Sequence, residues 1–105
     1  MLIVETSVFT RRVSELLSAD SYRALQVELV GDPRRGRVIR GSGGLRKLRW
    51  QGAGRGRRGG TRVVYYWAAA QETILLLLIY PKAEQEDLTR DQLQVLKRVV
   101  QEAFP

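Results

Sequence analysis

The residues best suited to chemistry in this 105-residue chain are cations gathered in one stretch. Residues 33–62 hold eleven basic residues and no acidic one, whereas the rest of the chain holds seven basic and eleven acidic residues. The net charge is +7. Because like charges repel one another in a folded chain, such a block indicates a polyanionic partner, and nucleic acid is the simplest one. The block comprises Arg34, Arg35, Arg37, Arg40, Arg46, Lys47, Arg49, Arg55, Arg57, Arg58 and Arg62.

Three of these cations are expected to share one surface. On a strand over residues 45–50, side chains alternate between the two faces, so Lys47 and Arg49 lie on one face and Arg46 on the other. Arg62 opens the next strand, and antiparallel pairing of the two strands brings it beside Lys47 and Arg49. Arginine binds phosphate oxygens through two hydrogen bonds, so the set predicts a phosphate-binding concavity. The alternative is a solvated strand face beside a polar loop.

Lys82 is a candidate general base. It follows directly after the apolar strand predicted over residues 73–80, and a strand end beside an open sheet face is a common place for reactive groups. A lysine among other cations has its ammonium form disfavoured, which suits it to accept a proton. The alternative is an ordinary surface lysine paired with Glu84 or Glu86.

The absence of cysteine and histidine from the sequence excludes several kinds of chemistry. Disulfides and thiolate sites need cysteine, whereas Ser-His triads and most zinc sites need an imidazole. The acidic residues at 84–91 match no metal-binding loop, and the glycine patterns lack the context of a dinucleotide fingerprint or a P-loop. We therefore expect chemistry without a metal or a nucleotide cofactor.

Further RNA contacts are expected around the same surface. Trp50 and Tyr66 are candidates for exposed rings that stack on bases, although alternation through residues 63–67 places most of the aromatic side chains in the core. The arginines of the glycine-rich stretch over residues 51–60 either bind RNA or only keep a loop soluble. The candidate RNA-binding residues are Arg46, Arg55, Arg57, Arg58 and Tyr66.

The elements that must position these residues follow the order β-α-α-β-β-β-α. Thr6 and Ser18 are suitable N-caps for two helices, and Gly31 ends the second one. The pattern from Thr89 to Gln92 is a capping box that opens a C-terminal helix. Between the helices lie strands over 45–50, 61–69 and 73–80, and a further strand is predicted over residues 1–5.

These elements predict one α+β domain over residues 1–105, a small antiparallel sheet with two N-terminal helices and a C-terminal helix packed on it. We expect the helices to cover one face of the sheet. The longest apolar run, residues 74–79, is far below the ~20 residues that span a bilayer. The N-terminus has no signal-peptide pattern, so a cytoplasmic protein is expected.

Several segments resemble the RelE/ParE superfamily of toxins, the toxin halves of type II toxin–antitoxin pairs. The segments are GGLRKLR (43–49), GTRVVYY (60–66) and IYPKAE (79–84), with Asp87, Leu88 and Thr89 after them. The opening VETSVFTRRV and the helix start at 18–22 resemble the HigB branch, so the resemblance covers nearly the whole chain. It implies a RelE-like fold, which agrees with the order of elements above.

The resemblance also implies a ribosome-dependent mRNA endonuclease, or mRNA interferase, that works without a metal. In such toxins the ribose 2′-OH attacks its adjacent phosphate and leaves a cyclic phosphate and a free 5′-OH. Lys47 and Arg49 match the paired cations on the strand before the loop. Arg62 matches the arginine that opens the next strand, and its implied role is to stabilise the transition state. Lys47 or Lys82 would be the base.

Two positions depart from the RelE pattern. RelE has a second catalytic arginine where this chain has Ala83, and a C-terminal tyrosine near the position of Thr89. The group that donates a proton to the leaving oxygen is therefore unassigned, and Lys82 or a nearby arginine is the candidate.

The implied partners are the ribosome with its mRNA, and a HigA-like helix-turn-helix antitoxin that represses the operator DNA together with the toxin. Two other functions stay open. ParE toxins share the fold but inhibit DNA gyrase without a nuclease site, and a non-catalytic RNA- or DNA-binding module would use the same basic face. The cluster of Lys47, Arg49 and Arg62 favours RNA chemistry.

Overall fold

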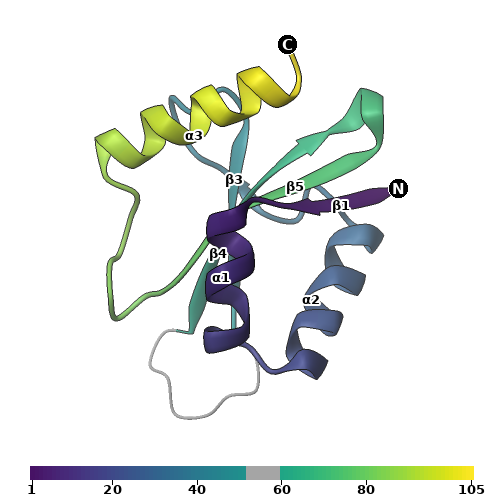
Figure 1. Ribbon diagram of the computed structural model, residues 1–105, viewed down its shortest axis with the longest axis vertical. Helices are drawn as coiled ribbons and strands as arrows, with labels where there is room; N and C mark the ends of the chain where they lie inside the picture. Colours follow the sequence, from purple (N-terminus) through teal and green to yellow (C-terminus); the bar gives the residue numbers. More distant parts are fainter. Residues whose placement is uncertain (52–59) are drawn as a thin grey trace.

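The computed structural model describes residues 1–51 and 60–105 and is built on one five-stranded sheet, most of whose strands are labelled in Figure 1. The strand order is β1-β5-β4-β3-β2; β1 pairs parallel with β5, and every other pair is antiparallel. The apolar strand β5 therefore lies inside the sheet, as its continuous hydrophobic sequence predicts. The strands are β1 (Leu2–Glu5), β2 (Arg37–Val38), β3 (Leu45–Trp50), β4 (Thr61–Ala68) and β5 (Thr73–Pro81).

The helices begin where the capping residues predict. They are α1 (Ser7–Leu16), α2 (Ala19–Gly31) and α3 (Arg90–Ala103), with a short 3₁₀ turn η1 (Ala69–Gln71) between β4 and β5. Thr6 and Ser18 accept hydrogen bonds from the backbone N–H groups of the first turns of α1 and α2. Thr89 and Gln92 form the predicted capping box. Within the described ranges, every helix is too short or too polar to span a bilayer.

The helices cover both faces of the sheet, so the prediction that they cover one face is wrong (Figure 1). α1 and α2 pack on one face, where Phe9, Leu25 and Leu29 belong to the same buried cluster as Val63 and other strand residues. α3 packs on the opposite face through Leu96 and Val100. The physical reason is that β5 is apolar on both faces, and burying only one of them would leave the other in water.

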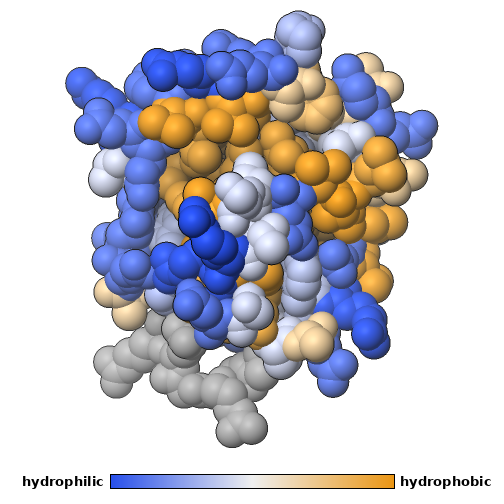
Figure 2. All heavy atoms as spheres, in the orientation of Figure 1, coloured by the Kyte–Doolittle hydropathy of each residue, from blue (hydrophilic) through white to orange (hydrophobic). Residues whose placement is uncertain are grey.

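An apolar groove of about 340 Å³ lies between α3 and the start of α1, because α3 does not close its face of the sheet completely. Figure 2 shows the apolar side chains beneath the polar outer face of α3. The groove is lined mostly by aliphatic residues: Val8, Leu77, Leu78, Val95, Leu96 and Val99.

The two-residue strand β2 is absent from the predicted order, and the buried Tyr65 fixes the segment that leads into it. The Tyr65 hydroxyl donates to the Pro33 carbonyl (2.7 Å) and accepts from the Gly36 N–H (2.8 Å). A Cβ on Gly36 would lie 2.7 Å from a Tyr65 ring carbon, so only glycine allows this approach. Tyr65 thereby positions Arg37, the first residue of β2.

Three buried or half-buried tyrosines make the fold sensitive to alkali. Burial raises the pKa of Tyr22, Tyr65 and Tyr80 above the ordinary value near 10, and the Glu5 carboxylate that accepts from the Tyr22 hydroxyl raises the pKa of Tyr22 further. The unfolded chain releases these protons first, so their contribution to stability is complete below pH ~10 and is lost as pH rises toward the folded values. Thermal unfolding followed by circular dichroism should show the melting temperature falling above pH ~10. Phenol ionisation near pH 10 in the intact fold would contradict this.

Candidate nucleic-acid interface

Four cations face one another in pairs on neighbouring strands. Arg37 on β2 lies opposite Lys47 on β3, and Arg49 on β3 lies opposite Arg62 on β4. Residues directly opposite in an antiparallel pair point to the same face, as do residues two apart on one strand. The four side chains therefore share the face on which α3 packs, and we call them the cationic face.

The cationic face is electrostatically unfavourable by itself. Like charges directly opposite each other destabilise a sheet, and here two successive cross-strand pairs are cation with cation. An anion bound between the pairs would relieve the repulsion. The arrangement can therefore bind an anionic group such as a phosphate or a carboxylate.

The cationic face lines a pocket of about 550 Å³, which we call the cationic pocket. Lys82, from the segment after β5, reaches the same pocket, so the structure brings together all four residues predicted as catalytic: Lys47, Arg49, Arg62 and Lys82. Lys47, Arg49 and Arg62 lie on the common surface expected for them, Lys82 adds a fourth cation that was not expected there, and the catalytic roles of all four stay predictions. The remaining lining residues are Arg35, Arg37, Leu48, Glu86 and Asp87.

Arg62 differs from its neighbours in burial. Its side chain is 4% exposed, although it lines the cationic pocket, whereas Arg49 is exposed to solvent. The surroundings of a buried guanidinium restrict its rotamers, so the group has few available positions. Water also screens the charge of a buried guanidinium only weakly. Arg62 is therefore the cation best suited to stabilise charge at one fixed point.

The cationic pocket also has an acidic edge. Asp87, between β5 and α3, accepts a hydrogen bond from the Lys47 Nζ at 2.5 Å. This contact, with a smaller contribution from Arg62, holds the pKa of the Asp87 carboxyl below its ordinary value. Glu84, one of the two residues considered as an ion-pair partner of Lys82, accepts from Arg12 of α1 at 2.9 Å.

Some of the predicted RNA-binding residues lie elsewhere. Arg46 is on the opposite face, where its guanidinium donates to the carbonyls of Arg34 (3.1 Å) and Gly36 (2.7 Å). Tyr66 packs against Phe104, with ring centroids 5.9 Å apart, in the core under α3. Both residues thus have structural contacts away from the cationic pocket. Arg55, Arg57 and Arg58 lie outside the described residues.

Trp50, the other candidate for an exposed ring, packs at the edge of the α1–α2 core, and its indole N–H donates to the Ser21 hydroxyl at 3.0 Å. Arg35 and Arg37 are pocket residues that the sequence did not single out. The only available signal was their place in the cationic block, because a two-residue strand has no detectable periodicity.

No family model matches the chain. Its fold is similar to that of a solved mutant of the E. coli toxin RelE in the free state, in which two arginines are replaced by alanine. The match has a TM-score of 0.59 and 17% sequence identity, and it covers 81% of this chain and 86% of the RelE chain. This chain has the RelE fold.

On this RelE fold, the two departures from the RelE pattern lie in the exposed segment between β5 and α3. Ala83 has no polar side-chain atom, and the Thr89 hydroxyl accepts from the Gln92 N–H (3.1 Å) as the cap of α3. The polar groups that this segment turns to the cationic pocket are instead Lys82, Glu86 and Asp87. Across residues 1–51 and 60–105, no three acidic, histidine or cysteine side chains gather as a metal site.

Proposed function

We propose that this chain is the toxin of a type II toxin–antitoxin pair, a HigB-like mRNA endonuclease that cuts mRNA on the ribosome in the cytoplasm. The observation that carries the proposal is the cationic face, whose two cation–cation pairs converge on one pocket of a RelE fold. The sequence segments that resemble HigB support the branch. Its antitoxin is a HigA-like helix-turn-helix protein, and the two together bind operator DNA.

The cations of the pocket suit an attack by the ribose 2′-OH on the adjacent phosphate. The 2′ oxygen forms a bond to phosphorus, the bond to the 5′ oxygen breaks, and the products are a cyclic phosphate and a free 5′-OH. Negative charge accumulates on the phosphate in the transition state, where the guanidinium groups of Arg49 and Arg62 would stabilise it. Lys47 or Lys82 would accept the 2′ proton, and a pocket cation would return a proton to the 5′ oxygen.

The two faces of β3 give a matched test of RNA binding. Arg49 points into the cationic pocket, whereas Arg46 points away and binds backbone carbonyls. For single-stranded RNA, each phosphate contact contributes about −0.7 to the slope of log K against log salt. Arg49→Gln should therefore make the slope shallower by about 0.7, and Arg46→Gln should leave it unchanged while lowering the melting temperature.

Binding is measured by fluorescence anisotropy with a 2′-O-methyl RNA oligonucleotide, which binds without being cut. Equal slopes for Arg49→Gln and the wild-type chain would remove Arg49 from the RNA interface.

The function itself is tested in a cell-free translation reaction with the purified chain, where mRNA ends are mapped by primer extension with and without ribosomes. We expect cuts within the mRNA that appear only with ribosomes. Intact mRNA and unimpaired translation would refute the nuclease, and inhibition of gyrase supercoiling would then assign the ParE-like function.

A further inference from the structure

An acidic side chain already occupies part of the cationic pocket. The Asp87 carboxylate meets the Lys47 Nζ at 2.5 Å, although the Asp87 side chain is 72% exposed and water could solvate it. The two residues are 40 positions apart in the chain, so local sequence does not impose the contact. Lys47 is a member of the cationic face, and its side chain is only 28% exposed.

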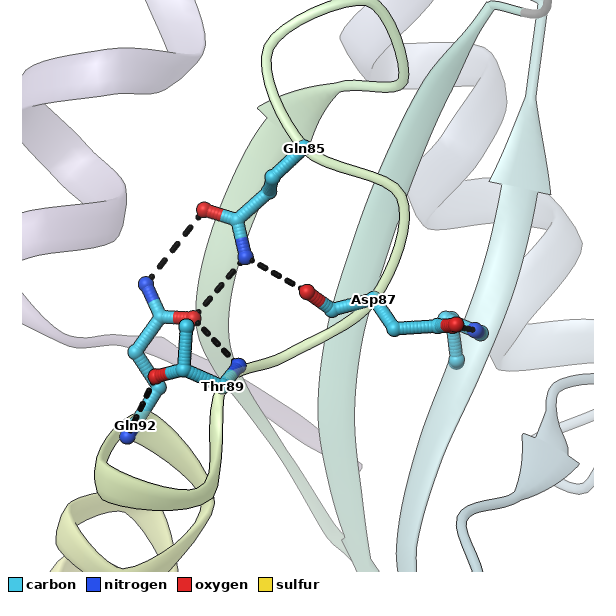
Figure 3. A network of polar contacts seen from close by, with 5 residues as sticks. Gln85, Asp87, Thr89 and Gln92 are labelled. Carbon is cyan, nitrogen blue, oxygen red and sulfur yellow. Dashed lines mark hydrogen bonds and ion pairs between the residues drawn. The ribbon is translucent and has the colours of Figure 1, made fainter.

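Hydrogen bonds to the first turn of α3 hold the segment that carries Asp87. The Gln85 side-chain N–H₂ donates to the Asp87 carbonyl (2.9 Å) and to the Gln92 side-chain oxygen (2.8 Å). The same Gln92 oxygen accepts from the Thr89 N–H (3.0 Å), as part of the capping box of α3. Figure 3 shows this network, with the Asp87 side chain turned away from Gln85 and Gln92 toward the strands of the sheet. The backbone of Asp87 is therefore anchored, and its carboxylate is presented to Lys47.

A carboxylate and an RNA phosphate compete for the same donors. Both offer anionic oxygens to Lys and Arg N–H groups, with similar hydrogen-bond geometry. Two anions on one ammonium also repel each other, most strongly where water is partly excluded. An RNA phosphate that reaches Lys47 must therefore displace Asp87 or accept a weaker contact.

We propose that Asp87 is a gating residue, an internal substitute for phosphate that occupies the Lys47 end of the cationic pocket until RNA displaces it. The proposal rests on the proposed function, because it takes an RNA phosphate as the competing ligand. It assigns two effects to one side chain. In the resting protein Asp87 offsets the repulsion within the cationic face, and during binding it weakens the affinity for RNA.

The test compares two variants that remove one negative charge each. Asp87→Asn removes the gate, and Glu102→Gln is the control, on an exposed residue in the last turn of α3. The probe is the 2′-O-methyl RNA oligonucleotide, bound to the full chain at fixed salt. We expect Asp87→Asn to bind about three- to tenfold more tightly than the wild-type chain, the range for loss of one exposed ion pair and its repulsion. Glu102→Gln should stay within about twofold, since screening weakens distant surface charges.

A double-mutant cycle with Lys47 tests whether the gain in RNA affinity of Asp87→Asn comes from the contact between Asp87 and Lys47. When Lys47→Gln is already present, Asp87 has lost its partner, so adding Asp87→Asn should give little further change in affinity. An equal gain with and without Lys47 would mean a general effect of charge and would overturn the gate.

The outcomes separate the gate from the proposed function. If Asp87→Asn binds no more tightly than Glu102→Gln while Arg49→Gln still weakens binding, then the pocket binds RNA and the gate is refuted. If the wild-type chain does not bind the RNA, or Arg49→Gln leaves its affinity intact, then RNA does not reach the cationic pocket unaided and the gate is refuted, while the proposed nuclease is decided separately by the cleavage of mRNA in the translation reaction.

Discussion

Replacing Arg62 by lysine should lower the rate of ribosome-dependent mRNA cleavage by about 10²–10³-fold, the usual effect of removing one positioned donor from a transition state. Lysine keeps the positive charge but loses the two parallel N–H groups that grip a phosphate. Because Arg62 is nearly buried, its surroundings hold the guanidinium at one point. The lysine ammonium cannot place two parallel N–H donors at that point. RNA binding should change only a few-fold, since the charge remains.

The control for this variant is Arg98→Lys, the same exchange on the exposed side of α3. It should cleave at the wild-type rate. A thermal melt of Arg62→Lys establishes that the fold is intact, and Arg49→Ala, on an exposed residue of the same pocket, gives a second reduction in cleavage. Wild-type cleavage by Arg62→Lys would mean that the reaction does not need the Arg62 guanidinium and would leave this residue a role that depends on charge alone.

Truncation of Leu29 should cause the largest loss of stability among the changes considered. Leu29 on α2 is completely buried in the core between α1, α2 and the sheet. Leu29→Ala removes buried apolar surface and leaves a cavity, which costs about 2–5 kcal/mol of unfolding free energy. For a domain of this size the melting temperature should fall by on the order of 10–20 °C.

Val27 provides the matched control on the same helix. It is 67% exposed, so Val27→Ala should change the unfolding free energy by less than about 0.5 kcal/mol. Chemical denaturation with urea measures both variants on one scale. Equal losses of unfolding free energy in Leu29→Ala and Val27→Ala would mean that α2 does not pack on the sheet through Leu29.

The sequence by itself determined the features that depend on near neighbours. Capping acts within one helical turn, so Thr6, Ser18 and Thr89 marked the starts of all three described helices correctly. Strand alternation is equally local, and it separated Arg46 from Lys47 before any pairing was known. The convergence of Arg49 with Arg62 followed from that alternation together with antiparallel pairing of consecutive strands.

Helical periodicity was a weaker guide on α2. Val30 follows the completely buried Leu29 directly, yet Val30 is 45% exposed. Apolar character alone therefore does not decide burial on α2, because only the side chains that face the sheet and α1 join the core.

Only the tertiary structure decided which distant residues complete the site. The pairing of Arg37 with Lys47 depends on a two-residue strand that Tyr65 holds in place, and the Asp87–Lys47 contact depends on where the segment between β5 and α3 lies relative to β3. The placement of α3 on the face opposite α1 and α2 likewise follows from packing against β5. These contacts form because residues far apart in the chain bury apolar surface or pair their charges together. Spacing along the sequence carries no record of such partners.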